Sequence, residues 1–119
     1  MHRSLIPLIP LIVSPWFAQA KTPAVTVEVL QTKLDHPWAL AFLPGDNGML
    51  ITLKGGQLRH WQSGKGLSDP LPGVPQVWAN GQGGLLDVAL APDFSHSRRV
   101  WLSFAQADAE GKAGTAVGF

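Results

Sequence analysis

Apolar residues in this chain gather in short runs that end at a proline, and one such pattern occurs twice. The first copy spans 35–44, and after a polar turn a second apolar run follows at 49–53. The second copy spans 84–94, and its partner run follows at 100–104. Short strands that repeat about every fifty residues predict the four-stranded blades of a β-propeller, which cover one another's faces.

The rest of the sequence also favours strands. Residues 25–30 alternate β-branched and polar side chains, as expected for a half-buried strand. Turn-forming residues occupy 45–48, a further strand is predicted at 57–61, and 63–75 is a loop rich in glycine and proline. No segment keeps a helical period over three turns, so we expect an all-β fold.

The first twenty residues predict a secretory signal. A short basic start precedes an apolar run at 5–17, and 18–20 supplies a small-x-small cleavage pattern. The apolar run is interrupted by prolines and is too short to span the roughly 30 Å hydrocarbon core of a bilayer. We therefore expect a signal peptide at 1–20 and an exported mature chain at 21–119, with no membrane span after cleavage.

Charge and cysteine content narrow the choice of partners and compartment. The chain has nine Lys or Arg residues against eight Asp or Glu residues, and it has no cysteine. This balance gives no electrostatic argument for nucleic acid or anionic lipid as a partner, because both need a concentrated basic surface. An exported chain without cysteine is compatible with the bacterial periplasm, where disulfides are permitted but not required.

The segment with the clearest candidate chemistry is 78–84, which precedes the second long apolar strand. Three of its last four residues are glycines, and Gln82 is the polar side chain among them. Glycine allows backbone conformations closed to other residues and lets a ligand approach closely. The Gln82 carboxamide both donates and accepts hydrogen bonds, so it could bridge a sugar hydroxyl and a neighbouring carbonyl. The alternative is that the segment is only a tight connection between strands.

Other polar and aromatic candidates have simpler expected roles. Because His36, His60 and His96 show no metal-ligand spacing, we expect them to act as caps or to lie on the surface. Asp87 could line a central channel, or it could bind neighbouring backbone amides. Four tryptophans are expected to pack between blades: Trp38, Trp61, Trp78 and Trp101.

The runs 36–44, 55–58 and, above all, 81–94 resemble a known family. This family comprises the soluble aldose sugar dehydrogenases of the bacterial periplasm, which depend on pyrroloquinoline quinone (PQQ). They are glucose/sorbosone dehydrogenase-like enzymes. The resemblance implies a six-bladed β-propeller that binds PQQ over its central channel together with calcium. It also implies an enzyme that oxidises aldose sugars to lactones by hydride transfer to the quinone and delivers electrons to an external acceptor. In such an enzyme Gln82 would reach the cofactor and substrate pocket.

The resemblance also implies that this chain is the amino-terminal part of a longer enzyme and holds only the opening blades of the propeller. The family's catalytic histidine occurs in a histidine-x-glycine-glycine-arginine run, which this sequence lacks, and the calcium ligands are expected beyond Phe119. We therefore assign no catalytic residue and no metal ligand here, and we expect the chain alone to be inactive. Two alternatives stay open: a calcium-dependent lactone hydrolase on a similar propeller, and a noncatalytic exported propeller that binds a protein or glycan.

Overall fold

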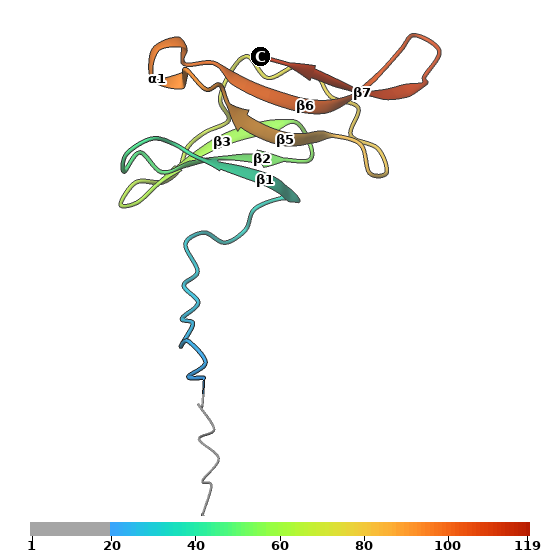
Figure 1. Cartoon of the computed structure of the whole chain (residues 1–119). Coiled ribbons are helices and arrows are strands. Elements are labelled where there is room, and N and C mark those ends of the chain that lie inside the picture. Colours follow the sequence, from blue (N-terminus) through green and yellow to red (C-terminus); the bar gives the residue numbers. More distant parts are fainter. Residues whose placement is uncertain (1–19) are drawn as a thin grey trace, which may run out of the picture.

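The computed structural model describes residues 20–119, which form two antiparallel β-sheets stacked on each other (Figure 1). Nearly all of the signal peptide expected at 1–20 lies outside the described residues. No helix in residues 20–119 is long and apolar enough to cross a membrane. The expected all-β class is confirmed, because every regular element of the described residues is a strand apart from one helix of four residues.

The first sheet contains four strands in the order β1-β2-β3-β4. They are β1 (Pro37–Phe42), β2 (Met49–Leu53), β3 (Gln57–Gln62) and β4 (Gly66–Leu67). The β1–β2 hairpin closes at Gly48, whose φ is +83° and whose added Cβ would lie 1.9 Å from the Trp61 carbonyl oxygen. Because only glycine fits at this point, the turn helps to fix the register in which Phe42 faces Met49.

The second sheet contains three strands in the order β5-β6-β7. They are β5 (Leu85–Leu90), β6 (Val100–Ala107) and β7 (Ala113–Gly118). A short helix, α1 (Phe94–Ser97), lies between β5 and β6 and ends at Arg98 in a left-handed conformation. The Ser97 N–H donates to the Asp93 carbonyl at 3.0 Å, so α1 is a single helical turn that begins after Asp93.

The repeated sequence pattern is also a repeated structure. In each copy the pairing register of the first and second strands shifts near the start of the first strand. A hydroxyl on the second strand accepts a backbone hydrogen bond at this shift. In the first copy Thr52 Oγ1 accepts from the Ala39 N–H at 3.0 Å, and in the second copy Ser103 Oγ accepts from the Asp87 N–H at 3.0 Å. The two copies therefore share their local geometry as well as their apolar pattern.

The two sheets bury a shared apolar core between them. Its buried residues come from both sheets: Leu50, Leu58, Leu85, Val88, Leu102 and Phe104. Leu85 is fully buried at the start of β5, because β5 packs against both β1 and β2. A second buried cluster contains Met49, Ile51 and Leu53, which alternate with the residues that face the shared core. Burial of Leu85 fixes the start of β5 and therefore the position of the glycine-rich segment before it.

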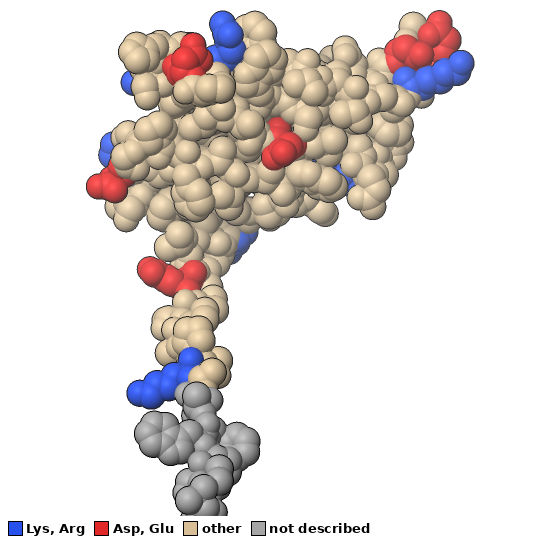
Figure 2. Space-filling model, in the orientation of Figure 1, with Lys and Arg blue, Asp and Glu red and all other residues tan. Residues whose placement is uncertain are grey.

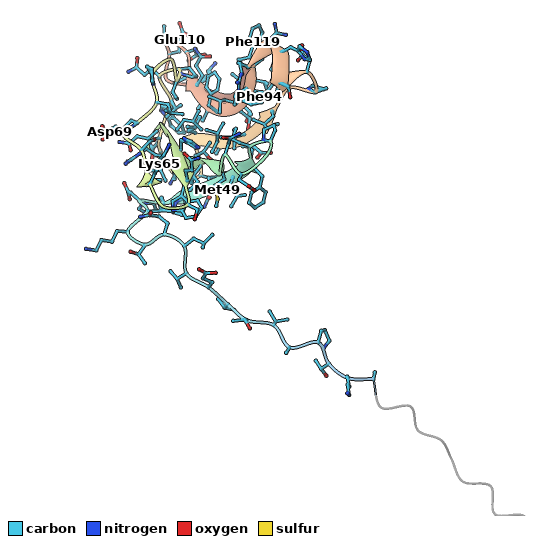
Figure 3. All side chains as sticks on the ribbon, turned by 90° about the vertical axis from the view of Figure 1, so that its left-hand side faces the viewer. Met49, Lys65, Asp69, Phe94, Glu110 and Phe119 are labelled. Atoms are coloured by element: carbon cyan, nitrogen blue, oxygen red, sulfur yellow. The ribbon has the colours of Figure 1, made fainter. Side chains whose placement is uncertain are left out.

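One strand predicted from the sequence is absent from the described structure. Residues 25–30 form no strand, and the side chains of Val25, Val27 and Val29 are 82%, 86% and 72% exposed. The segment belongs to an arm that extends away from the two sheets (Figures 1 and 3). The prediction is wrong because alternating residue types show which face a strand would bury, but a strand also needs a neighbouring strand for its backbone hydrogen bonds.

Two smaller differences concern the edges of the sheets. The loop expected at 63–75 contains β4, which pairs with β3 through Trp61 and Leu67. The second sheet has three strands in the described residues, whereas a four-stranded blade was expected from the repeat. Strand β7 is therefore an edge of this sheet within residues 20–119.

Candidate functional site

The segment that precedes β5 forms a tight turn at 80–83. The Gly83 N–H donates to the Asn80 carbonyl at 2.8 Å, and Gly81 has a φ of +55°. A positive φ at the first central residue alone is typical of a type II′ turn, where glycine is preferred. Just before the turn, the Trp78 N–H donates to the carbonyl of Ala105 in β6 at 2.8 Å. This bond anchors the segment to the second sheet.

Close packing requires two glycines of this segment. A Cβ at Gly83 would lie 2.7 Å from the Trp78 carbonyl oxygen, and a Cβ at Gly84 would lie 2.2 Å from the Lys54 carbonyl oxygen. Gly84 also has a φ of +145°, which residues with a Cβ rarely adopt. The interpretation of the segment as a tight connection is therefore correct for Gly83 and Gly84.

Gln82 differs from its neighbours because no contact within the fold accounts for its side chain. Its side chain is exposed, and its carboxamide forms no hydrogen bond with any atom of residues 20–119. A Cβ at Gly81 would meet no heavy atom within 4 Å, so open space adjoins the turn. A carboxamide with free donor and acceptor atoms beside open space is able to bind a polar ligand.

Lys54, which the sequence pattern does not single out, joins this turn to the first sheet. It follows β2 directly, and its N–H donates to the His36 carbonyl at 3.0 Å. Its carbonyl accepts from the Leu85 N–H at 3.0 Å, and its side-chain ammonium donates to the Gly81 carbonyl. A lysine after an apolar strand is normally a solvated residue, so the sequence carries no signal for this contact across 27 positions.

Asp87 is exposed on β5 and is also bonded to the backbone. Its Oδ1 accepts from the Val88 N–H at 2.9 Å. Asp87 therefore binds a neighbouring backbone amide, as one of its two expected roles requires, and a place for it in a central channel stays a prediction. This contact stabilises the irregular start of β5, where the pairing register shifts.

The histidines make local contacts. His36 Nδ1 lies 2.5 Å from Asp35 Oδ1, and His60 Nε2 lies 2.6 Å from the Asn47 carbonyl oxygen. His96 is exposed on α1. Among residues 20–119, no group of three or more His, Cys, Asp or Glu side chains is arranged to hold a metal ion.

The four tryptophans of the described residues are only partly covered. Trp61 and Trp78 are half-buried, whereas Trp38 is 49% exposed and Trp101 is 36% exposed. The Trp101 ring meets the Phe119 ring edge-on, with 4.8 Å between their centroids. Trp38 and Trp101 thus keep apolar area that a further element could cover, and their packing between blades stays a prediction.

Charged side chains are sparse over the face shown in Figure 2. The clearest group lies at the β6–β7 turn, where Asp108, Glu110 and Lys112 mix both signs. No basic field covers the sheets on this face, in keeping with the nearly balanced composition of the chain.

The sequence matches the family described as Glucose / Sorbosone dehydrogenase over residues 34–119, a range that includes every strand of both sheets. The chain belongs to this family. The resemblance found in the runs 36–44, 55–58 and 81–94 is thereby confirmed.

Proteins similar to this chain include other Glucose / Sorbosone dehydrogenase-like enzymes. The chain is 67% identical to the aldose sugar dehydrogenase YliI of Escherichia coli (strain K12) over an alignment of 122 residues. This alignment covers 100% of this chain and 32% of YliI. The crystal structure of the soluble aldose sugar dehydrogenase from Escherichia coli in the apo-form has a TM-score of 0.75 and 76% identity, over 76% of this chain and 26% of that chain. The PQQ-bound form of an aldose sugar dehydrogenase from Streptomyces coelicolor has a TM-score of 0.52 and 26% identity, over 76% of this chain and 32% of that chain.

These similarities also confirm the architecture predicted from the repeat. The two sheets correspond to part of the propeller-fold aldose sugar dehydrogenases of the Glucose / Sorbosone dehydrogenase family. The chain spans about a third or less of the length of the family members that it matches.

Proposed function

We propose that this chain is the amino-terminal part of a periplasmic enzyme that oxidises aldose sugars to lactones with PQQ as the hydride acceptor. Family membership and similarity to a PQQ-bound aldose sugar dehydrogenase support this reaction class. The same membership favours a dehydrogenase over a calcium-dependent lactone hydrolase or a noncatalytic binding module. The observation that carries the role of this chain is the exposed Gln82 carboxamide, which has no partner within residues 20–119 although the turn beneath it is tightly bonded.

The residues present fit PQQ in their chemistry. PQQ carries carbonyl and carboxylate oxygens, and a sugar carries hydroxyl groups, so both offer atoms that the Gln82 carboxamide can bond. Gly81 brings no side chain that would block a flat ring, and the space where its Cβ would lie is open. Bound PQQ would supply an acceptor for the hydride of the anomeric carbon, and a base outside this chain would take the sugar hydroxyl proton. Gln82 contributes by holding a ligand oxygen in place, since a carboxamide stays neutral and keeps its protons.

The remaining parts of the proposed site lie outside this chain. The catalytic histidine and the calcium ligands are expected beyond Phe119, and an external acceptor removes the electrons. A signal peptide at 1–20 would direct the protein to the periplasm and leave Lys21 at the mature terminus.

The variant Gln82→Ala, made in the longer protein, tests this role. If the carboxamide bonds the cofactor or the sugar, its removal leaves a desolvated ligand atom unmatched, at a cost of about 1–3 kcal/mol. Sugar oxidation with added PQQ and calcium should fall by roughly ten- to a hundredfold, because about 1.4 kcal/mol corresponds to a factor of ten. The melting temperature without cofactor should change little, since the side chain makes no contact that the fold needs.

Gln76→Ala is the matched control, because Gln76 is another exposed glutamine in the same loop. This control should keep wild-type activity and stability. Wild-type activity in Gln82→Ala, or a loss of activity that follows general unfolding, would contradict the proposal.

A further inference from the structure

Lys54 bonds across the boundary between the two sheets, and its side chain is not needed for strand pairing. The corresponding residue of the second repeat is Ala105, whose N–H donates to the Gly84 carbonyl at 2.8 Å. The Lys54 N–H donates to the His36 carbonyl in the same way at 3.0 Å. Alanine is sufficient for this backbone bond, so the bond does not account for the contact of the Lys54 ammonium with the Gly81 carbonyl.

The Lys54 ammonium binds the Gly81 carbonyl oxygen, and the orientation of this carbonyl determines the backbone conformation of Gln82. Gly81 and Gln82 are the two central residues of the 80–83 turn, and the Gly81 carbonyl oxygen belongs to the peptide that joins them. Because Gly81 has no Cβ, this peptide rotates more freely than it would beside another residue. Rotation would turn the carbonyl away from Lys54 and force Gln82 toward a positive φ, which would redirect its side chain.

Packing and charge around Lys54 also favour this contact. The Lys54 residue is half-buried, and its Cγ would lie 2.8 Å from a Cβ at Gly84, so its aliphatic part runs along the glycine-rich segment. Within residues 20–119 no carboxylate lies in ion-pair range of the ammonium. A hydrogen bond from a charged donor is stronger than one between neutral groups, so the bond from Lys54 restrains the orientation of the Gly81 carbonyl.

We propose that Lys54 is a positioning residue that holds the Gly81–Gln82 peptide so that the Gln82 carboxamide points at the bound ligand. This inference rests on the proposed role of Gln82 in binding PQQ or sugar. Lys54 acts through the turn and does not have to touch the ligand. Loss of its ammonium leaves both backbone bonds of Lys54 in place, so the turn loosens while the sheets stay paired.

The test uses the longer protein with two substitutions at this position. Lys54→Met keeps the length of the side chain and removes the charge, whereas Lys54→Arg restores a charged donor. In the cofactor-free protein, hydrogen exchange of the Gly83 amide, which is bonded to the Asn80 carbonyl, should speed up by about fivefold or more in Lys54→Met and stay near wild type in Lys54→Arg. The affinity for PQQ, titrated by absorbance, should fall by about five- to twentyfold in Lys54→Met and recover in Lys54→Arg.

Lys65→Met is the matched control, because Lys65 is exposed in the turn between β3 and β4, in the first sheet (Figure 3). It should change neither the exchange of the Gly83 amide nor the affinity for PQQ. If Lys54→Met does not accumulate as folded protein, Lys54→Ala replaces it, since alanine occupies the corresponding position of the second repeat.

Three results overturn a part of the account, and each identifies which part. Unchanged exchange at Gly83 in Lys54→Met overturns the restraint of the turn, whatever the affinity for PQQ. Faster exchange with wild-type affinity for PQQ overturns the positioning role, provided that Gln82→Ala weakens PQQ binding. If Gln82→Ala itself leaves both PQQ binding and sugar oxidation unchanged, the proposed function of Gln82 fails, and exchange alone decides whether Lys54 restrains the turn.

Discussion

The two repeats share their strand geometry but differ in the turn that leads into each first strand. Positive φ angles occur at corresponding positions: at Lys33 and His36 before β1, and at Gly81 and Gly84 before β5. The φ values of +58° at Lys33 and +55° at Gly81 are similar, so the two segments share this feature of the backbone. The difference lies in packing, because Gly84 lies against the Lys54 carbonyl whereas the His36 side chain is 77% exposed.

Leu34 and Gln82 occupy corresponding positions in these two turns. Leu34 is half-buried and packs against the buried cluster of Met49, Ile51 and Leu53 in the first sheet. Gln82 is exposed and bonds to no atom of residues 20–119. The fold uses this position for packing in one repeat and leaves it free in the other, which supports a ligand-binding role for Gln82.

The largest difference in stability is expected between substitutions at Gly84 and His36, the corresponding residues just before β5 and β1. Gly84→Ala in the longer protein places a Cβ against the Lys54 carbonyl and combines a steric clash with a strained φ. The free energy of unfolding should fall by at least about 3 kcal/mol. His36→Ala should change the free energy of unfolding by no more than about 0.5 kcal/mol, because His36 already has a Cβ and its side chain is exposed. Thermal or denaturant unfolding measures both, and equal losses would show that the two turns are packed alike.

A smaller effect is expected at the paired hydroxyls. Thr52 is fully buried, and its hydroxyl donates to the Leu86 carbonyl at 2.6 Å and accepts from the Ala39 N–H. Thr52→Val leaves both backbone groups without a partner and should cost about 2 kcal/mol of stability. Ser103→Ala should cost only about 0.5–1 kcal/mol, because the Asp87 N–H is in an exposed residue that water can reach. Denaturant unfolding of the two variants compares them, and a larger loss for Ser103→Ala would contradict this ranking.

The smallest effect on stability is expected from exchanging the residue types at the two turn positions. Leu34→Gln removes a half-buried apolar side chain and should cost about 1 kcal/mol. Gln82→Leu should leave stability nearly unchanged while weakening PQQ binding, because the position is exposed and leucine cannot hydrogen-bond. Melting temperatures and PQQ titrations separate the two effects. Destabilisation by Gln82→Leu equal to that of Leu34→Gln would mean that both positions serve packing.

The repeat made most of the sheet arrangement predictable from sequence. Apolar runs that end at Pro44 and Pro92 define the first strand of each copy, and the turns after them fix the next strand. The prediction of a strand at 25–30 was wrong because the periodicity of a segment does not show whether a sheet edge is available to pair with it. Residues 63–75 contain β4, whose two residues are too few to produce an alternating pattern.

The candidate site was only partly accessible to sequence reasoning. Gln82 stands out because it is the polar residue in a glycine-rich run, and that composition is visible in the chain. The link between Lys54 and Gly81 joins residues 27 positions apart in different repeats, so only the stacking of the sheets brings them together. The need for glycine at Gly84 has the same origin, since it depends on the Lys54 carbonyl rather than on local sequence.

The central claim is that the 80–83 turn presents Gln82 to the cofactor and substrate. A crystal structure of the longer protein with PQQ and an aldose bound tests it most directly. The account predicts a hydrogen bond of roughly 2.7–3.2 Å between the Gln82 carboxamide and an oxygen of PQQ or of the sugar. A Gln82 side chain that bonds only to protein or solvent, with the ligand out of its reach, would contradict the account.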